Sequence, residues 1–210
     1  MEKKILYICI ILISAYCIYQ KISYNSKSQM FSQMQLDGSS FKALKECIDI
    51  EDQCKGKSVS NIKLSDSNDR EYYFYDVLAN YATEYYLVII SSIEACSTCR
   101  DKTLKIWNDL YKTDKNMPVI LIISEQEELS TSDRRLIKAS INGLNNSIPY
   151  YFDKESDLLG YLGVSPYQTP LSIILTHDKK IIALNKASEH TTERTLILKK
   201  LFISINSNKE

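Results

Sequence analysis

The residues best suited to chemistry are Cys96 and Cys99, which stand three positions apart in a Cys-x-x-Cys arrangement. An unbroken β-branched and aromatic run at 85–90 precedes them, and an amphipathic helical pattern follows. Such a run is typical of a strand buried on both faces. The order predicts that Cys96 stands at a helix N-terminus, where free backbone N–H groups and the helix dipole favour an anion. We therefore expect its thiol pKa to lie below the free value of about 8.5.

A thiolate at Cys96 is suited to thiol–disulfide exchange. The thiolate attacks a disulfide, and a second thiol one helical turn later resolves the mixed disulfide. This chemistry predicts Cys96 as the attacking thiol and Cys99 as the resolving thiol of a redox-active disulfide. The hydroxyl groups of Ser97 and Thr98 are candidates to donate hydrogen bonds to the thiolate.

A Cys-x-x-Cys is also half of a zinc site. A complete structural zinc site would need two more ligands, drawn from His177, His190 and the remaining soluble cysteines, Cys47 and Cys54. An inert structural disulfide is a second alternative. Cys47 and Cys54 themselves could form a small structural disulfide, act as a second redox relay, or stay unpaired.

From about residue 57 the chain alternates strand and helix patterns. The order β, α, β, α, loop, β, β, α predicts an α/β fold in which a mixed sheet is covered by helices on both faces. Trp107 occupies a core position of the helix after the cysteines. Strands are expected at 62–64, 72–74, 85–90, 119–123, 150–152, 171–175 and 180–184, and helical segments at 41–54, 77–81, after Cys99, and at 129–144, 158–162 and 191–205.

Thr169 and Pro170 stand immediately before the strand expected at 171–175. Proline is tolerated as the first residue of a strand, and the base rate of about 5% for cis X–Pro bonds predicts a trans bond. A buried strand, a Cys-x-x-Cys at a helix start and a later Thr-Pro before a hairpin together resemble the thioredoxin superfamily. In that superfamily the Thr–Pro bond is cis and lies against the cysteines. The resemblance implies that Thr169 and Pro170 contact the substrate backbone.

The residues at 56–66 resemble the N-terminal hairpin of the membrane-anchored TlpA/ResA-like branch. Over about 57–205 the resemblance implies a thioredoxin-like three-layer α/β/α sandwich with a mixed sheet and an N-terminal β-hairpin extension. The chain departs from the family pattern at Ala95, where Trp is usual, and at Ile90, where thioredoxins keep a buried acid. Glu94 is the nearest carboxylate in the sequence, and it is either a substitute for that acid or an ordinary exposed loop residue.

The N-terminus carries an uncharged apolar stretch at 5–19, preceded by Lys3 and Lys4. No Ala-x-Ala cleavage site follows it, so residues 1–22 are expected to form a signal anchor with one transmembrane helix. The domain would then face the periplasm or the cell exterior. A lipid-modified Cys17, a cleaved signal peptide and a buried helix of a soluble domain are the alternatives. Residues 23–56 would form a tether with a short helical segment, and residues 57–206 the thioredoxin-like domain.

The chain has 26 basic and 26 acidic side chains and no long run of like charge, which disfavours a nucleic-acid partner. We expect an exported thiol–disulfide oxidoreductase that reduces client proteins through Cys96 and Cys99, without a cofactor or metal. A membrane redox partner would recycle it. The alternatives are a thioredoxin-fold binding or assembly module without turnover, and a Cu(I) chaperone that uses both thiols and a histidine. A peroxidase is disfavoured because no proline lies upstream of Cys96.

Overall fold

The structure is a computed structural model that describes residues 38–125, 137–139, 141, 143, 146–188 and 192–207. The expected anchor, the tether up to residue 37 and His190 lie outside the described residues. The chain divides into two compact units, Met1–Lys42 and Ala43–Glu210. The elements are α2 (Gly38–Cys54), β1 (Lys63–Ser65), β2 (Glu71–Tyr73), α3 (Phe74–Ala79), β3 (Tyr85–Ser92), α4 (Ser97–Thr113), β4 (Val119–Ser124), β5 (Tyr150–Asp153), α6 (Asp157–Leu162), the short 3₁₀ helix η1 (Pro166–Gln168), β6 (Leu171–Thr176), β7 (Ile181–Lys186) and α7 (Thr192–Ser207).

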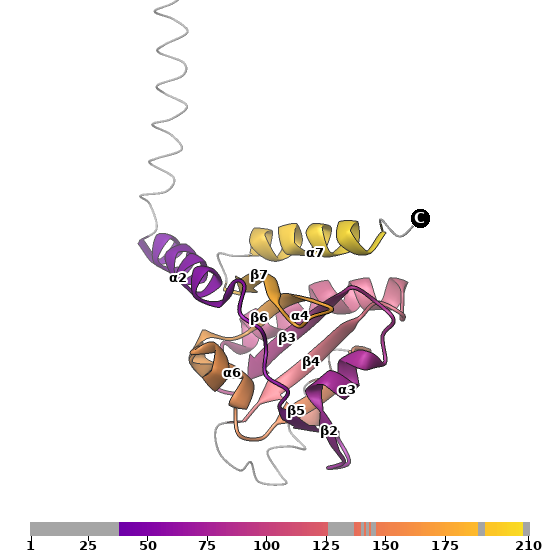
Figure 1. The fold of residues 1–210 in the computed structure, drawn as a ribbon. Helices are drawn as coiled ribbons and strands as arrows, with labels where there is room; N and C mark the ends of the chain where they lie inside the picture. The colour runs from indigo at the N-terminus through magenta and orange to yellow at the C-terminus, as the bar shows by residue number, and fades with distance from the viewer. Residues whose placement is uncertain are drawn as a thin grey trace, which may run out of the picture. The chain divides into compact units, whose positions relative to one another are not determined.

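The second unit is built on one seven-stranded mixed sheet with the order β2-β1-β5-β4-β3-β6-β7 (Figure 1). β3, β4 and β5 are parallel, whereas β6 is antiparallel to both β3 and β7. The β1–β2 hairpin pairs antiparallel with β5 at the other end of the sheet. The buried β-branched runs therefore form the centre of the sheet, and the expected mixed α/β architecture is confirmed.

Helices cover both faces of the sheet, as expected. One face packs against α4 and α7 through a core that includes Leu104, Trp107 and Phe202. Ile137 and Ile141, which belong to the helix expected at 129–144, are buried in the same core. The rest of that helix is largely outside the described residues. The opposite face packs against α3 and α6.

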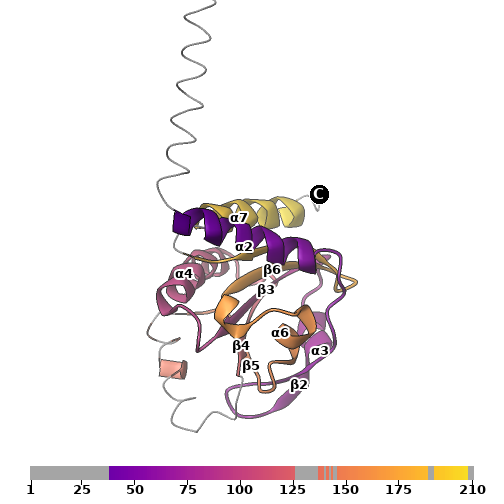
Figure 2. The ribbon, with the colours of Figure 1, turned by 90° about the vertical axis from the view of Figure 1, so that its left-hand side faces the viewer.

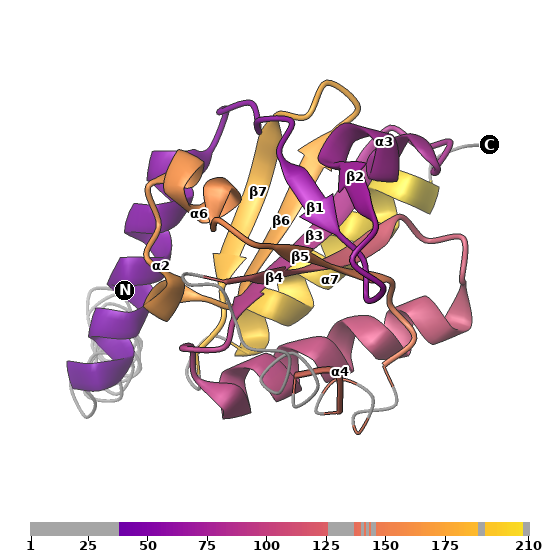
Figure 3. The same ribbon diagram turned by 90° about the horizontal axis from the view of Figure 1, so that it is seen from below.

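Helix α2 extends the packing beyond the expected domain start at 57. Cys47, Ile50 and Cys54 are buried at 0%, 4% and 0% exposure. In the view of Figure 2 α2 lies in front of α7, to which Glu51 connects it by an ion pair with Arg194, and Figure 3 shows α2 beside α6 and the β7 edge of the sheet. The apolar spacing of its buried residues follows one helical face, so residues from Ala43 onward belong to the same compact unit as the sheet.

Among the residues that the structure describes, no helix is long and apolar enough to cross a bilayer.

A row of polar side chains ends three neighbouring parallel strands. Ser92, Ser124 and Asp153 are in register on β3, β4 and β5. The Asp153 carboxylate is 1% exposed and accepts the backbone N–H groups of Asp157 and Leu158 at 3.1 and 3.0 Å, so it caps the start of α6. Burial raises the pKa of Asp153 to about 6, although these hydrogen bonds oppose the shift.

The raised pKa of Asp153 predicts a pH-dependent contribution to stability. Its folded-state pKa of about 6 exceeds the unfolded value of about 3.9, so the stabilising contribution is complete below pH 4 and is lost as the pH rises through 6. Asp153→Asn removes this titration and keeps one acceptor for the α6 amides. The free energy of unfolding of the wild type minus that of the variant should fall by about 2–3 kcal/mol between pH 4 and pH 7. Urea unfolding at several pH values measures it, and a pH-independent difference would contradict the assignment.

Candidate active site

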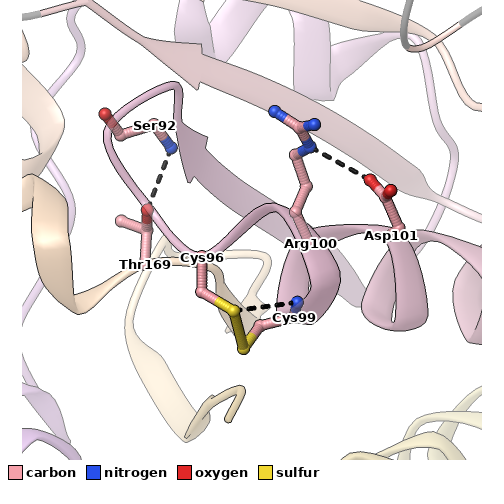
Figure 4. A network of polar contacts seen from close by, with 6 residues as sticks. All are labelled: Ser92, Cys96, Cys99, Arg100, Asp101 and Thr169. Carbon is pink, nitrogen blue, oxygen red and sulfur yellow. Dashed lines mark hydrogen bonds and ion pairs between the residues drawn. A yellow bond between two sulfur atoms is a disulfide. The ribbon is translucent and has the colours of Figure 1, made fainter. Parts of the chain in front are cut away.

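The antiparallel pairing of β3 with β6 brings together the two segments that the sequence singled out. Ile90 pairs with Leu171, so the loop that leaves the end of β3 lies beside the residues that enter β6. The backbone N–H of Ser92 donates to Thr169 Oγ1 at 2.9 Å, and Thr169 Oγ1 donates to the carbonyl of Pro166 at 2.8 Å. The Thr169 side chain thereby ties the η1 loop to the end of β3 (Figure 4).

Cys96 occupies the N-cap of α4, as predicted. Its Sγ accepts a hydrogen bond from the backbone N–H of Cys99 at 3.2 Å (Figure 4). Cys96 and Cys99 are joined by a disulfide with a Cα–Cα distance of 5.3 Å. Free N–H groups at a helix start favour a negative charge, so reduction of this bond would leave the Cys96 sulfur in surroundings that favour a thiolate.

The two sulfurs differ in their access to solvent. Cys96 is exposed, whereas Cys99 is 6% exposed. Ser97 and Thr98 are also exposed. Within the described residues, Cys96 Sγ accepts its hydrogen bond from the Cys99 amide rather than from either of these hydroxyls. The exposure pattern suits an attacking sulfur at Cys96 and a protected resolving sulfur at Cys99.

The Thr169–Pro170 peptide bond is cis. The cis bond expected from the family resemblance is therefore confirmed, and the trans bond expected from the base rate is wrong. Thr169 and Pro170 are themselves buried. The large apolar side chain that this loop exposes is Tyr167, at 68%. It was not singled out in the sequence, where it is one of fifteen tyrosines.

Helix α4 is held against β6 by a buried polar contact. Trp107 Nε1 donates to Ser172 Oγ at 2.9 Å, and both residues are 0% exposed. The helix that begins with the dithiol is thus fixed to the strand that follows Pro170. The prediction that Trp107 is a core residue is confirmed.

The acidic residues near the dithiol are arranged differently from the pattern in thioredoxins. Ile90 is fully buried within the core. Glu94 is half-buried, and its Oε2 accepts a hydrogen bond from Ser92 Oγ at 2.8 Å. Two carboxylates that the sequence reasoning did not consider, Glu125 and Asp153, are buried at the ends of β4 and β5. Each directly follows or ends an apolar strand, which is the signal that could have identified them.

Arg100 lies in the first turn of α4, beside the cysteines in sequence. Its Nε pairs with Asp101 Oδ1 at 3.3 Å, and its side chain points away from the sulfurs (Figure 4). The guanidinium charge of Arg100 is therefore directed away from the Cys96–Cys99 disulfide.

The other two cysteines of the described residues, Cys47 and Cys54, are free and buried in α2. Cys47 Sγ contacts Asn185 Oδ1 at 3.3 Å, and Cys54 Sγ contacts the carbonyl of Leu162 at 3.8 Å. Seven residues of helix separate them by about 10 Å, beyond the roughly 7 Å limit for Cα atoms of a disulfide. A Cys47–Cys54 disulfide is therefore excluded in this fold. Burial raises the pKa of both thiols.

The remaining ligand candidates are dispersed. His177 lies in the turn after β6, about 20 Å along that strand from Pro170. Within the described ranges, no group of three or more His, Cys, Asp or Glu side chains could hold a metal ion. A cavity of 740 Å³ lies between β1, β5 and α6, and its lining includes Asp153 and Lys63 but neither cysteine.

Comparisons with known proteins place this geometry in context. No protein-family model matches the sequence, and no curated protein sequence matches it. Several solved structures match the fold. A thiol:disulfide interchange protein from Bacteroides sp. is 19% identical with a TM-score of 0.51, over 75% of this chain and 93% of that one. A thioredoxin-like protein from Porphyromonas gingivalis is 16% identical with a TM-score of 0.53, over 75% and 96%.

A peroxidoxin, BcpB from Mycobacterium tuberculosis, matches at 12% identity with a TM-score of 0.51, over 70% of this chain and 97% of that one. The same architecture therefore serves more than one thiol chemistry, and the chemistry has to be argued from the site. The sheet order, the disulfide at the start of α4, the cis-proline before β6 and these structural matches together identify the chain as a member of the thioredoxin fold.

Proposed function

We propose that the protein is a thiol–disulfide oxidoreductase that exchanges disulfides with client proteins through Cys96 and Cys99. The observation that carries the proposal is the exposed Cys96 sulfur at the N-cap of α4, bonded to a buried Cys99 and flanked by the cis-proline loop. A metal site or an inert disulfide would not need one accessible sulfur at a helix N-terminus beside a cis-proline loop.

The reaction follows from the different exposure of the sulfurs. The Cys96 thiolate attacks a client disulfide, forming a Cys96–client bond and releasing the other client sulfur as a thiolate. Cys99 then loses its proton, and its thiolate attacks the Cys96 sulfur. A Cys96–Cys99 disulfide forms and the second client thiolate leaves. Two electrons pass from the dithiol to the client, so the protein acts as a reductant and needs a dithiol donor for its next cycle.

The surroundings of the disulfide suit a polypeptide client. Ile93 is 37% exposed in the loop before Cys96, and Tyr167 is 68% exposed in the loop before Pro170. These apolar side chains flank the site from two loops. Thr169 and Pro170 would contribute mainly backbone to the client contact, and Glu94 would support the proton transfer.

The proposal includes export and membrane anchoring. The uncharged stretch at 5–19 behind Lys3 and Lys4 supports a signal anchor. An anchored domain outside the cytoplasm would work where disulfides form and persist. A membrane redox partner would then supply electrons to Cys96 and Cys99.

The assignment of roles predicts the order in which the reduced thiols react. Cys96 should be alkylated at least about tenfold faster than Cys99, because it is exposed and capped by backbone N–H donors. Cys47 and Cys54 should react most slowly, since burial raises the pKa of their thiols. Time-resolved iodoacetamide labelling with mass spectrometry measures all four rates. Equal or faster labelling of Cys99 would reverse the roles.

The exchange mechanism predicts which variant traps a client. Cys99→Ser should accumulate a mixed disulfide between Cys96 and a protein disulfide such as those of insulin, because the resolving thiol is missing. Cys96→Ser should trap none, and Cys54→Ser should behave like the wild type. Non-reducing gels detect the adduct. No adduct with Cys99→Ser, together with no insulin reduction by the wild type, would favour the binding-module alternative.

A further inference from the structure

Helix α2 reaches the cis-proline loop through one side chain. Glu46 Oε1 accepts a hydrogen bond from Gln168 Nε2 at 3.1 Å, between residues 122 positions apart in the sequence. Gln168 is the last residue of η1, two positions before Pro170. A helix that precedes the rest of the folded unit therefore contacts the loop beside the dithiol.

Gln168 is held at both ends of its amide. Its Oε1 accepts the backbone N–H of Ser165 at 2.9 Å, which closes a capping box across η1. Its Nε2 group is the donor to Glu46. Tyr167, whose side chain is exposed, lies between Ser165 and Gln168 in the sequence. The same turn therefore fixes the backbone of Tyr167.

The second oxygen of Glu46 reaches the other side of Pro170. Glu46 Oε2 forms an ion pair with Lys186, whose side chain is 12% exposed. Lys186 is paired in register with Leu171, the residue after Pro170, and the N–H of the next residue, Ala187, donates to the Pro170 carbonyl at 2.9 Å. One carboxylate thus connects the chain before Pro170 with the strand beside it.

Helix α2 is itself firmly attached at this point. Cys47 Sγ accepts the backbone N–H of Lys186 at 3.4 Å and contacts Asn185 Oδ1. Glu51 forms an ion pair with Arg194 of α7, one turn further along α2. A carboxylate on a helix that is already fixed restricts the loop more than a carboxylate on a mobile segment would, because less conformational freedom remains to be lost.

We propose that Glu46 is a positioning residue for client exchange: by holding Gln168 and Lys186, it sets the position of Tyr167 and Pro170 relative to the Cys96 sulfur. The inference rests on the proposed exchange function. It assigns to α2 a role at the client side of the reaction, whereas the attack of Cys96 on a small disulfide needs no contact with the η1 loop. The two kinds of substrate should therefore respond differently to its loss.

The test compares two substrates with the full-length reduced chain. Glu46→Ala should lower kcat/KM for insulin reduction by about tenfold, the factor that 1.4 kcal/mol produces. It should leave the second-order rate with oxidised glutathione and the Cys96–Cys99 redox equilibrium within about twofold. Gln168→Ala should lower kcat/KM for insulin similarly, and the double variant should show little further loss because the two side chains act through one contact. Glu46→Gln keeps an acceptor for Gln168 and should recover part of the rate.

Asp49→Ala is the matched control, because it removes an exposed ion pair within the same helix, the one with Lys45, and it should leave both rates within about twofold of the wild type. The inference is overturned if Glu46→Ala reduces insulin as fast as the wild type, or if Glu46→Ala slows both substrates equally, as general loss of stability would. A wild type that reduces neither substrate would instead overturn the proposed function itself.

Discussion

The structure depends on the antiparallel pairing of β3 with β6. An antiparallel pair places the end of one strand beside the start of the other, and Ile90 paired with Leu171 fixes which residues meet there. This pairing determines which loop residues lie side by side next to the strand ends. The Cys96 loop leaves β3 where the Thr169–Pro170 segment enters β6, and the Ser92 amide and Thr169 hydroxyl join the two segments.

The helices supply the remaining parts of the site. α4 supplies the Cys99 amide that donates to the Cys96 sulfur, and the Trp107–Ser172 contact holds this helix to β6. α2 and α6 pack on the opposite face, where α2 reaches the η1 loop. Elements of both helical layers therefore contribute to the site. It combines a helix N-terminus that favours a negative charge with a loop that is available to a client.

Much of this could be predicted from the sequence. The β-branched runs at 85–90 and 119–123 identify central strands because few other structures bury such runs, and strand-Cys-x-x-Cys-helix order places Cys96 at an N-cap. Local patterns cannot show contacts between distant residues, so the Glu46–Gln168 bond could not be predicted. A Cys47–Cys54 disulfide is one of three alternatives that the sequence leaves open, and the continuous helix between the two residues excludes it. The cis Thr169–Pro170 bond could be expected only from the family resemblance.

The most direct test of the account is an equilibrium redox titration of the Cys96–Cys99 pair in the full-length chain, by thiol trapping in dithiothreitol or glutathione buffers. The account predicts one reversible two-electron transition at a potential near that of thioredoxin, about −270 mV, which would allow the dithiol to reduce clients. A potential well above about −180 mV would contradict the reductant role. A pair that neither opens nor re-forms at a measurable rate would contradict thiol–disulfide exchange altogether.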